Sequence, residues 1–306
     1  MRDAQAMGAA THPLWRDLLT LCKWRVVMVM LVCALVGMLL AIPGAISPAA
    51  LNAMVCGLIG IALAAAGAAA INHVVDRKLD ARMHRTSRRP LASGRLSTPL
   101  ALAWALSLST SGVALLALTV NPLTAWLTLL SLVGYALIYT VFLKRATPQN
   151  IVIGGVAGAA PPLLGWTSVT GTVGAEPLLL MLIIFAWTPP HFWALAIYKR
   201  DEYAEAGVPM LPVTHGLAFA RLQVWLYGWL TVAATLLPFT IGMSGWLYLV
   251  SVCVLNLRFM QWNLRVWRGH DEQAPLQAFW FSIRYLLGVF LALLLDHYLS
   301  IALSPA

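Results

Sequence analysis

The chain has 306 residues, of which 60% are hydrophobic and only 10% are charged. Ordinary soluble domains are about one-quarter charged, so this composition excludes that class and predicts an all-α polytopic membrane protein. The formal net charge of +9 could suggest nucleic acid, but attraction to anionic membrane lipid explains cations in loops beside apolar segments without such a partner.

Nine apolar segments are predicted to form transmembrane helices, and each is long enough to cross about 30 Å of hydrocarbon. They cover residues 26–46, 49–71, 100–120, 124–143, 151–170, 177–198, 222–243, 246–264 and 277–297. Residues 1–22 are interpreted as a polar cytoplasmic tail, which gives no sign of a cleavable signal peptide. We expect residues 1–306 to form a single domain, a bundle of nine transmembrane helices.

Lysine and arginine residues collect on one side of this predicted bundle. With a cytoplasmic N-terminus, eighteen of the 20 lie in inner segments, and Arg258 and Arg284 lie within apolar segments toward the same side. The positive-inside rule therefore predicts a cytoplasmic N-terminus and, with an odd number of spans, an outer C-terminus. Because the long polar loops are also on the inner side, we expect the chemistry at the cytoplasmic membrane surface.

An amide and two carboxylates, Asn72, Asp76 and Asp80, are spaced four residues apart where the second apolar segment ends. On an α-helix such residues drift only about 40° per step, so the three side chains line one face. A run of cations accompanies them: Arg77, Lys78, Arg82, Arg85, Arg88, Arg89 and Arg95. This combination is typical of a site for a Mg²⁺-bridged diphosphate.

A second acidic cluster follows the sixth apolar segment. Asp201 and Glu205 repeat the four-residue spacing beside Lys199 and Arg200. Two carboxylate clusters that face each other across a cavity can hold one or two Mg²⁺ ions and stabilise a diphosphate leaving group. A solvated surface is the alternative for a short acidic run. Whether Glu202 or Glu205 completes the second metal site depends on the helix phase after Asp201.

Several cations could share the diphosphate, and the sequence does not rank them. The candidates are Arg77, Arg82, Arg85, Lys144, Arg145, Lys199 and Arg200. The apolar interior would accommodate an isoprenoid tail and shelter an allylic cation from bulk water.

Longer sequence blocks extend both clusters. They are Asn72-His73 through Asp76-Arg77, Met83, Arg85-Thr86, Arg89-Pro90, Gly94-Arg95, Pro148-Gln149-Asn150, Gly154 to Trp166, Thr188-Pro189-Pro190-His191-Phe192-Trp193, Asp201-Glu202-Tyr203 and Ala206 to Pro212. With these blocks the chain resembles the UbiA-type intramembrane prenyltransferases, and within them the protohaem IX farnesyltransferase (haem O synthase) branch. The resemblance runs from about the first apolar segment to the ninth. Glu202 departs slightly, because the family often has a second Asp there.

The resemblance implies a bacterial inner-membrane enzyme with its helices around a central cavity. It would transfer the farnesyl group of farnesyl diphosphate to a vinyl group of haem B, with addition of water, and haem A synthase is a possible partner. The metal ligands implied for Mg²⁺ are Asn72, Asp76, Asp80, Asp201 and Glu205, with Asp76, Asp80 and Asp201 as the catalytic carboxylates. Arg77 and Lys144 would be secondary phosphate contacts, alongside Arg85, Lys199 and Arg200.

Haem as a substrate raises the question of an axial ligand. His191 follows two prolines near the inner end of the sixth segment, and His73 lies within the first acidic block. Our hypothesis is that His191 contacts haem, at the iron or at a propionate, with His73 as a weaker candidate. A packing residue that donates a hydrogen bond is the alternative for each of them.

Three other functions compete with this interpretation. The first is a prenyltransferase for another acceptor, such as a quinone precursor or a chlorin. Only the sequence blocks that carry the family resemblance argue against it. A transporter or channel would place ionisable residues near the midplane and show internal repeats, whereas here nearly all charges lie at one face. A scaffold for assembly of a respiratory oxidase would leave two matched acidic clusters unexplained.

Overall fold

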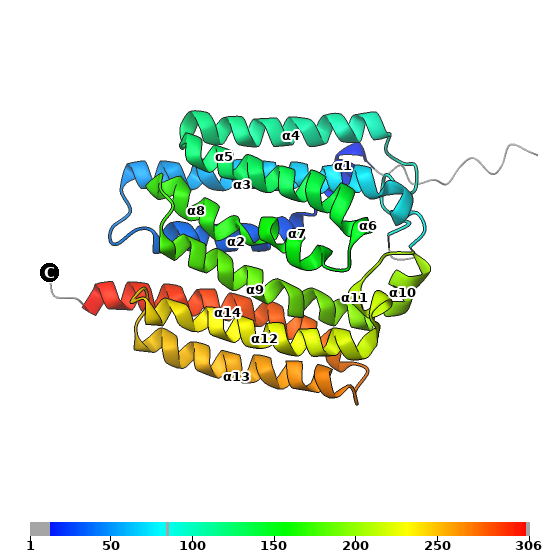
Figure 1. Ribbon diagram of the computed structural model, residues 1–306. Coiled ribbons are helices and arrows are strands. Elements are labelled where there is room, and N and C mark those ends of the chain that lie inside the picture. The colour runs from blue at the N-terminus through cyan, green and yellow to red at the C-terminus, as the bar shows by residue number, and fades with distance from the viewer. Residues whose placement is uncertain (1–12, 84–85, 304–306) are drawn as a thin grey trace, which may run out of the picture.

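The computed structural model describes residues 13–83 and 86–303, and within these ranges all regular structure is helical (Figure 1). The helices are α1 (Leu14–Leu21), α2 (Trp24–Leu40), α3 (Pro48–Asp80), α4 (Thr98–Thr119), α5 (Pro122–Val133), α6 (Lys144–Ala146), α7 (Asn150–Ala159), α8 (Pro161–Thr170), α9 (Ala175–Tyr198), α10 (Arg200–Glu205), α11 (Leu211–Thr214), α12 (Gly216–Thr240), α13 (Trp246–Arg268) and α14 (Ala274–Leu303). A π-helical segment, Gly134–Leu143, joins α5 to α6. The all-α prediction is confirmed.

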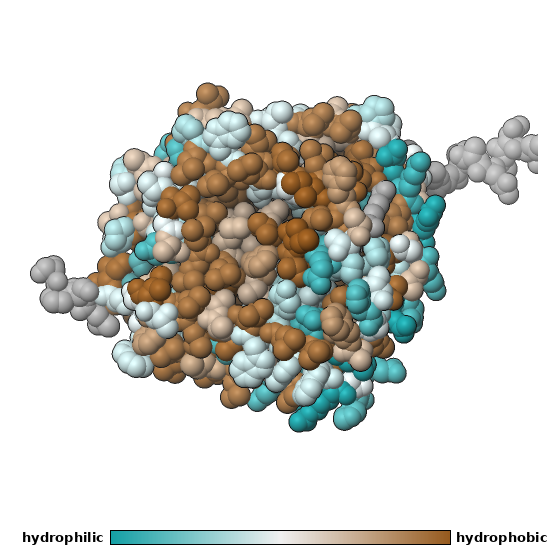
Figure 2. Space-filling model, in the orientation of Figure 1, coloured by the Kyte–Doolittle hydropathy of each residue, from teal (hydrophilic) through white to brown (hydrophobic). Residues whose placement is uncertain are grey.

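Several helices are long and apolar enough to cross a membrane. Seven of the described helical stretches meet this requirement, and α1 with α2, bent by 49° where they join, would make an eighth span. Figure 2 shows a broad hydrophobic surface across the middle of the bundle, with hydrophilic residues gathered at the end where α10 and α11 lie. The chain is therefore an integral membrane protein. The count of nine spans and the central cavity stay predictions.

Two of the predicted apolar segments differ from the helices that the structure shows at these positions. Helix α3 continues past the expected end at residue 71 to Asp80, because no glycine or proline interrupts 72–80 and the polar side chains on its inner face are buried. The predicted span 151–170 is divided into α7 and α8 at Ala160, where Pro161 and Pro162 remove two backbone donors. The first acidic motif thus lies on a continuous helix rather than in a loop.

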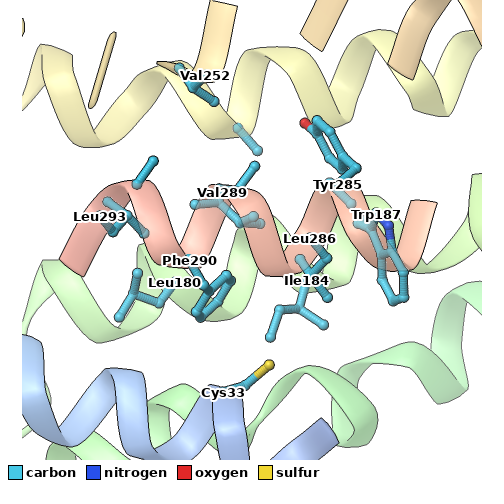
Figure 3. Packing of buried hydrophobic residues seen from close by; sticks show 14 of the residues in the cluster. Cys33, Leu180, Ile184, Trp187, Val252, Tyr285, Leu286, Val289, Phe290 and Leu293 are labelled. Carbon is cyan, nitrogen blue, oxygen red and sulfur yellow. The ribbon is translucent and has the colours of Figure 1, made fainter. Parts of the chain in front are cut away.

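The largest apolar cluster in the described part of the chain lies between α9, α13, α14 and α2. Figure 3 shows Leu180 and Ile184 from α9 beside Leu286 and Phe290 from α14, with Cys33 of α2 opposite them. All five side chains are buried. Lipid is as apolar as these side chains, so close packing rather than exclusion from water holds such helices together.

Small residues allow a close approach between α2 and α8. A Cβ atom at Gly165 would lie 2.0 Å from the carbonyl oxygen of Ala34, and one at Gly37 would lie 2.2 Å from that of Pro162. Real side chains do not tolerate such distances, so each backbone fits against the other only because both positions are glycine.

Asp296 is a buried carboxylate within α14 that joins this helix to α13. It accepts hydrogen bonds from the backbone N–H groups of Gly245, at 2.6 Å, and Tyr248, at 3.0 Å. Gly245 is the N-cap residue of α13 and Tyr248 lies in its first turn, where N–H groups have no partner within the helix. Asp296 therefore serves as an N-cap supplied by a neighbouring helix.

Candidate functional site

The first acidic motif lies in the last three turns of α3, with all three side chains buried. Asn72 and Asp80 are 4% exposed and Asp76 is 1% exposed. The Nδ2 group of Asn72 donates to Asp76 Oδ2 at 2.8 Å, as the shared helical face predicts. Figure 1 places this end of α3 at the same end of the bundle as α6, α10 and α11.

Three basic side chains contact this face of α3. Lys23 donates to Asn72 Oδ1 and Lys144 donates to Asp76 Oδ2 at 2.6 Å. Arg89 donates one N–H group toward both oxygens of Asp80, at 2.8 and 2.9 Å. Three positive charges thus meet two carboxylates, and a buried anion needs such partners because desolvation without them is very costly. The local excess of positive charge suits a polyanionic ligand.

The π-helical segment Gly134–Leu143 brings Lys144 to the motif. Thr140 of this segment is fully buried, donates to the carbonyl oxygen of Tyr135 at 2.8 Å and accepts from Asn72 Nδ2 at 3.3 Å. Lys144 follows directly after the segment. The wider turn of a π-helix shifts the side chains that follow, and such segments occur frequently at functional sites.

One oxygen at the centre of this cluster has no partner among the described residues. Asp76 Oδ1 is buried and accepts no hydrogen bond from them, although Oδ2 of the same carboxylate accepts from both Asn72 and Lys144. A buried carboxylate oxygen without a donor is costly unless a cation binds it. Carboxylate and amide oxygens are hard ligands suited to Mg²⁺, so Asn72, Asp76 and Asp80 fit that ion.

The second acidic cluster lies on the short helix α10 and is more exposed. Asp201 and Glu205 are exposed, whereas Glu202 is partly buried and forms an ion pair with Lys199 at 3.5 Å. Among the described residues, no group of three or more His, Cys, Asp or Glu side chains is close enough together to hold a metal ion. The structure therefore does not assemble the five expected ligands into one centre, and their joint role stays a prediction.

The other cations expected to bind phosphate are placed differently. Arg77 is partly buried and donates to the carbonyl oxygen of Val74 at 2.9 Å, and Arg200 is exposed at the start of α10. The Lys199 ammonium lies 5.6 Å from the ring centre of Tyr198. Arg85 lies outside the described residues. Lys144, from the same set of candidates, directly contacts the acidic face of α3.

His191 is buried in an aromatic sandwich. Its ring stacks on Trp187, with centroids 4.2 Å apart, and on Phe279, at 4.4 Å. His191 Nδ1 shares a hydrogen bond of 2.6 Å with Ser282 Oγ, which also lies 2.7 Å from the carbonyl oxygen of Phe279. Which of the two atoms donates depends on the tautomer of the imidazole, and the contact fixes the orientation of the ring in either case.

His73 has a different environment, because it is 2% exposed and neither ring nitrogen has a hydrogen-bond partner within the described part of the chain. Buried imidazoles are normally hydrogen-bonded, so both ring nitrogens of His73 are candidates to bind a ligand. Its place next to Asn72 puts that ligand close to the first acidic motif.

Two basic residues of the site were missing from the sequence-based set, namely Lys23 and Arg89. Lys23 lies at the break between α1 and α2 and has a left-handed backbone with φ of 47°. Arg89 belongs to the cation run, and its position within the Arg89-Pro90 block was the available signal. No pattern in the sequence singles out Lys23, which comes from a segment distant from α3.

Comparisons with known proteins identify the family of the chain. The model of the UbiA prenyltransferase family matches residues 30–294. A Protoheme IX farnesyltransferase from Hahella chejuensis is 58% identical over 304 residues, covering 99% of this chain and all of that protein. The chain therefore belongs to the UbiA prenyltransferase family. It is an enzyme of the prenyltransferase class, which confirms the family resemblance.

Solved structures share the fold at low sequence identity. A structure of digeranylgeranylglyceryl phosphate synthase is similar with a TM-score of 0.77 and 17% identity, covering 92% of this chain and 98% of that one. A UbiA homologue from Archaeoglobus fulgidus bound to DMAPP and Mg²⁺ has a TM-score of 0.63 and 18% identity, covering 90% and 99%. These likenesses establish the fold, and the second protein binds a prenyl diphosphate with a divalent metal.

Proposed function

We propose that this chain transfers a farnesyl group from farnesyl diphosphate to a vinyl group of haem B, with addition of water, giving haem O and diphosphate. The observation that carries the proposal is the buried face of Asn72, Asp76 and Asp80 with its three basic partners. The name of the 58% identical Hahella protein supports farnesyl as the donor and protohaem as the acceptor.

The chain's own residues would hold the diphosphate in place. Asn72, Asp76 and Asp80, with Asp201 and Glu205 from α10, would bind Mg²⁺, which supplies positive charge to neutralise the diphosphate oxygens. Lys144 and Arg89 now neutralise the carboxylates, and once a metal does so their N–H groups can donate to phosphate instead. Arg77, Arg85, Lys199 and Arg200 are further candidates for phosphate contacts.

The bond changes need no nucleophilic side chain. The C–O bond of the allylic diphosphate breaks and its electron pair leaves with the diphosphate. The vinyl π electrons form the new C–C bond to the farnesyl carbon. Water then adds to the resulting carbocation next to the porphyrin and loses a proton, which leaves a hydroxyl group. The apolar walls of the bundle would keep other water away from the allylic cation.

The proposal also fixes where the reaction would take place. The site would open to the cytoplasmic face of a bacterial inner membrane, with the N-terminus on the same side and residues 1–306 acting as one domain. The cation distribution supports this orientation. An association with haem A synthase, which would use the product, stays a prediction.

Mass spectrometry of haem extracted from membranes that express this chain tests the proposal. We expect a haem heavier by one hydrated farnesyl unit with the wild type, and its loss with Asp76→Ala in protein shown to be folded by gel filtration. Unmodified haem B from folded wild-type protein supplied with farnesyl diphosphate would redirect the proposal to another acceptor, such as a quinone precursor or a chlorin. Full activity in Asp76→Ala would reject the metal assignment.

A role of His191 in haem binding is tested separately. If Nε2 binds haem, His191→Ala should change the absorption spectrum of added haem and weaken its binding by about tenfold or more, as loss of a metal ligand does. Ser282→Ala removes the group that holds Nδ1 and should give a smaller effect of the same kind. Unchanged spectra and affinity in His191→Ala would leave this residue with a packing role.

A further inference from the structure

Two arginines lie on the outer surface of the bundle, well inside helices α13 and α14. Arg258 of α13 and Arg284 of α14 are both exposed. Each lies ten residues from the loop 269–273 that joins the two helices, which corresponds to about 15 Å along the axis. Because α13 and α14 pack against each other as antiparallel neighbours, the two arginines lie at the same level.

A pocket of about 440 Å³ connects these arginines. Its lining comes from both helices and consists of Arg258, Trp262, Gln277, Trp280, Phe281 and Arg284. The spacing of these residues is three or four positions along each helix, so they form one continuous stripe per helix. Polar and aromatic groups from two helices thus share one hollow.

The charge of this pocket is not balanced by acids. Among the described residues, neither Arg258 nor Arg284 forms a salt bridge with a carboxylate. Arg258 donates to Gln261 Oε1 at 2.9 Å and lies 5.5 Å from the ring centre of Trp262. The guanidinium of Arg265 lies 4.6 Å from the same ring. Uncompensated arginines within membrane segments are costly, which favours an anion from outside the chain.

The pocket is separate from the proposed catalytic site. The opposite face of α14 carries Phe279 and Ser282, which hold His191 inside the bundle. Trp280, only one residue further along, is 55% exposed and faces outward. Because the stripe points to the surrounding bilayer rather than to the interior, its ligand should come from the membrane itself.

We propose that this pocket between α13 and α14 binds the phosphate headgroup of an anionic phospholipid. The two guanidinium groups can donate several hydrogen bonds to phosphate oxygens, and they are more weakly hydrated than ammonium groups. Trp262 and Trp280 lie closer to the loop 269–273 than the arginines do, so their rings are placed to flank the headgroup. Basic pockets between membrane helices on the positively charged side bind anionic lipid headgroups in this way.

The test is lipid binding to the purified full-length protein in detergent, counted by native mass spectrometry. We expect one tightly bound phosphatidylglycerol per chain, and weaker binding of phosphatidylcholine with the same acyl chains. Arg258→Gln and Arg284→Gln should each weaken phosphatidylglycerol binding about fivefold, and the double variant about 30-fold. Arg268→Gln makes the same charge change on α13 outside the pocket lining and should leave the affinity unchanged.

Several outcomes would overturn the proposal. Equal binding of the two lipids by wild-type protein would reject a headgroup site, and this result does not depend on whether any variant folds. A folded double variant that retains phosphatidylglycerol would reject these two arginines. Displacement of bound phosphatidylglycerol by an equal concentration of haem or of inorganic phosphate would assign the pocket to that other anion.

Discussion

At the scale of single residues, the site is an arrangement of buried charges that neutralise one another. Asp76 and Asp80 each have one basic partner, and Asn72 joins Lys23 to Asp76 because its amide carries both a donor and an acceptor. Removal of one member of a buried pair leaves the other unpaired, whereas removal of both charges does not. The stability of single and double variants of the metal-free protein measures this difference.

We expect Lys144→Gln to destabilise the metal-free protein by about 3 kcal/mol, because Asp76 then stays buried without its cation. Lys144→Gln combined with Asp76→Asn should lose less than the sum of the two single changes. Thermal unfolding in detergent with a chelator present measures all four proteins. Strictly additive effects would show that the 2.6 Å contact between Lys144 and Asp76 contributes nothing to stability.

Lys23 combines a functional side chain with an unfavourable backbone. Its φ of 47° costs any residue with a Cβ atom about 1 kcal/mol relative to glycine. We therefore expect Lys23→Gly to be about 1 kcal/mol more stable than Lys23→Ala, while both lose the contact with Asn72 and the same fraction of farnesyl transfer. Paired unfolding and activity measurements check this. Equal stability of the two variants would mean that the helix break does not require this conformation.

At the scale of helices, close backbone contact sets the distance between α2 and α8. Gly165→Ala would push a methyl group against the Ala34 carbonyl, so we expect a loss of about 2 kcal/mol. The matched control is Gly158→Ala in α7, where a Cβ atom would meet nothing within 4 Å. This change should be neutral or stabilising by up to about 1 kcal/mol. Thermal unfolding of both variants distinguishes steric contact from helix propensity.

At the scale of the whole molecule, the remaining question is orientation in the membrane. In a chain whose four cysteines are replaced, Val173→Cys marks the loop between α8 and α9, and Gln273→Cys marks the loop between α13 and α14. We expect a membrane-impermeant maleimide to label Val173→Cys in intact cells, and Gln273→Cys only after permeabilisation. The reverse pattern would invert the proposed topology and place the reaction on the outer side.

The sequence predicts the helices well and the site only in part. The apolar segments each coincide with a helical stretch, because a backbone in lipid must satisfy its own hydrogen bonds. The face of Asn72, Asp76 and Asp80 follows from helical periodicity alone. The basic partners of that face cannot be predicted from periodicity. Lys23 is 49 residues from Asn72 along the chain, and Lys144 is 68 residues from Asp76.

The all-helical membrane class, the prenyltransferase family and the position of the acidic motif can therefore be predicted from the amino-acid sequence. These properties depend on local composition and on spacing within one helix. The packing of the helices sets which cations neutralise which carboxylates, leaves Asp76 Oδ1 without a donor among the described residues, and places Ser282 against His191. It also brings Arg258 and Arg284 into one pocket. Each of these facts is a contact between distant segments, which depends on how the helices pack.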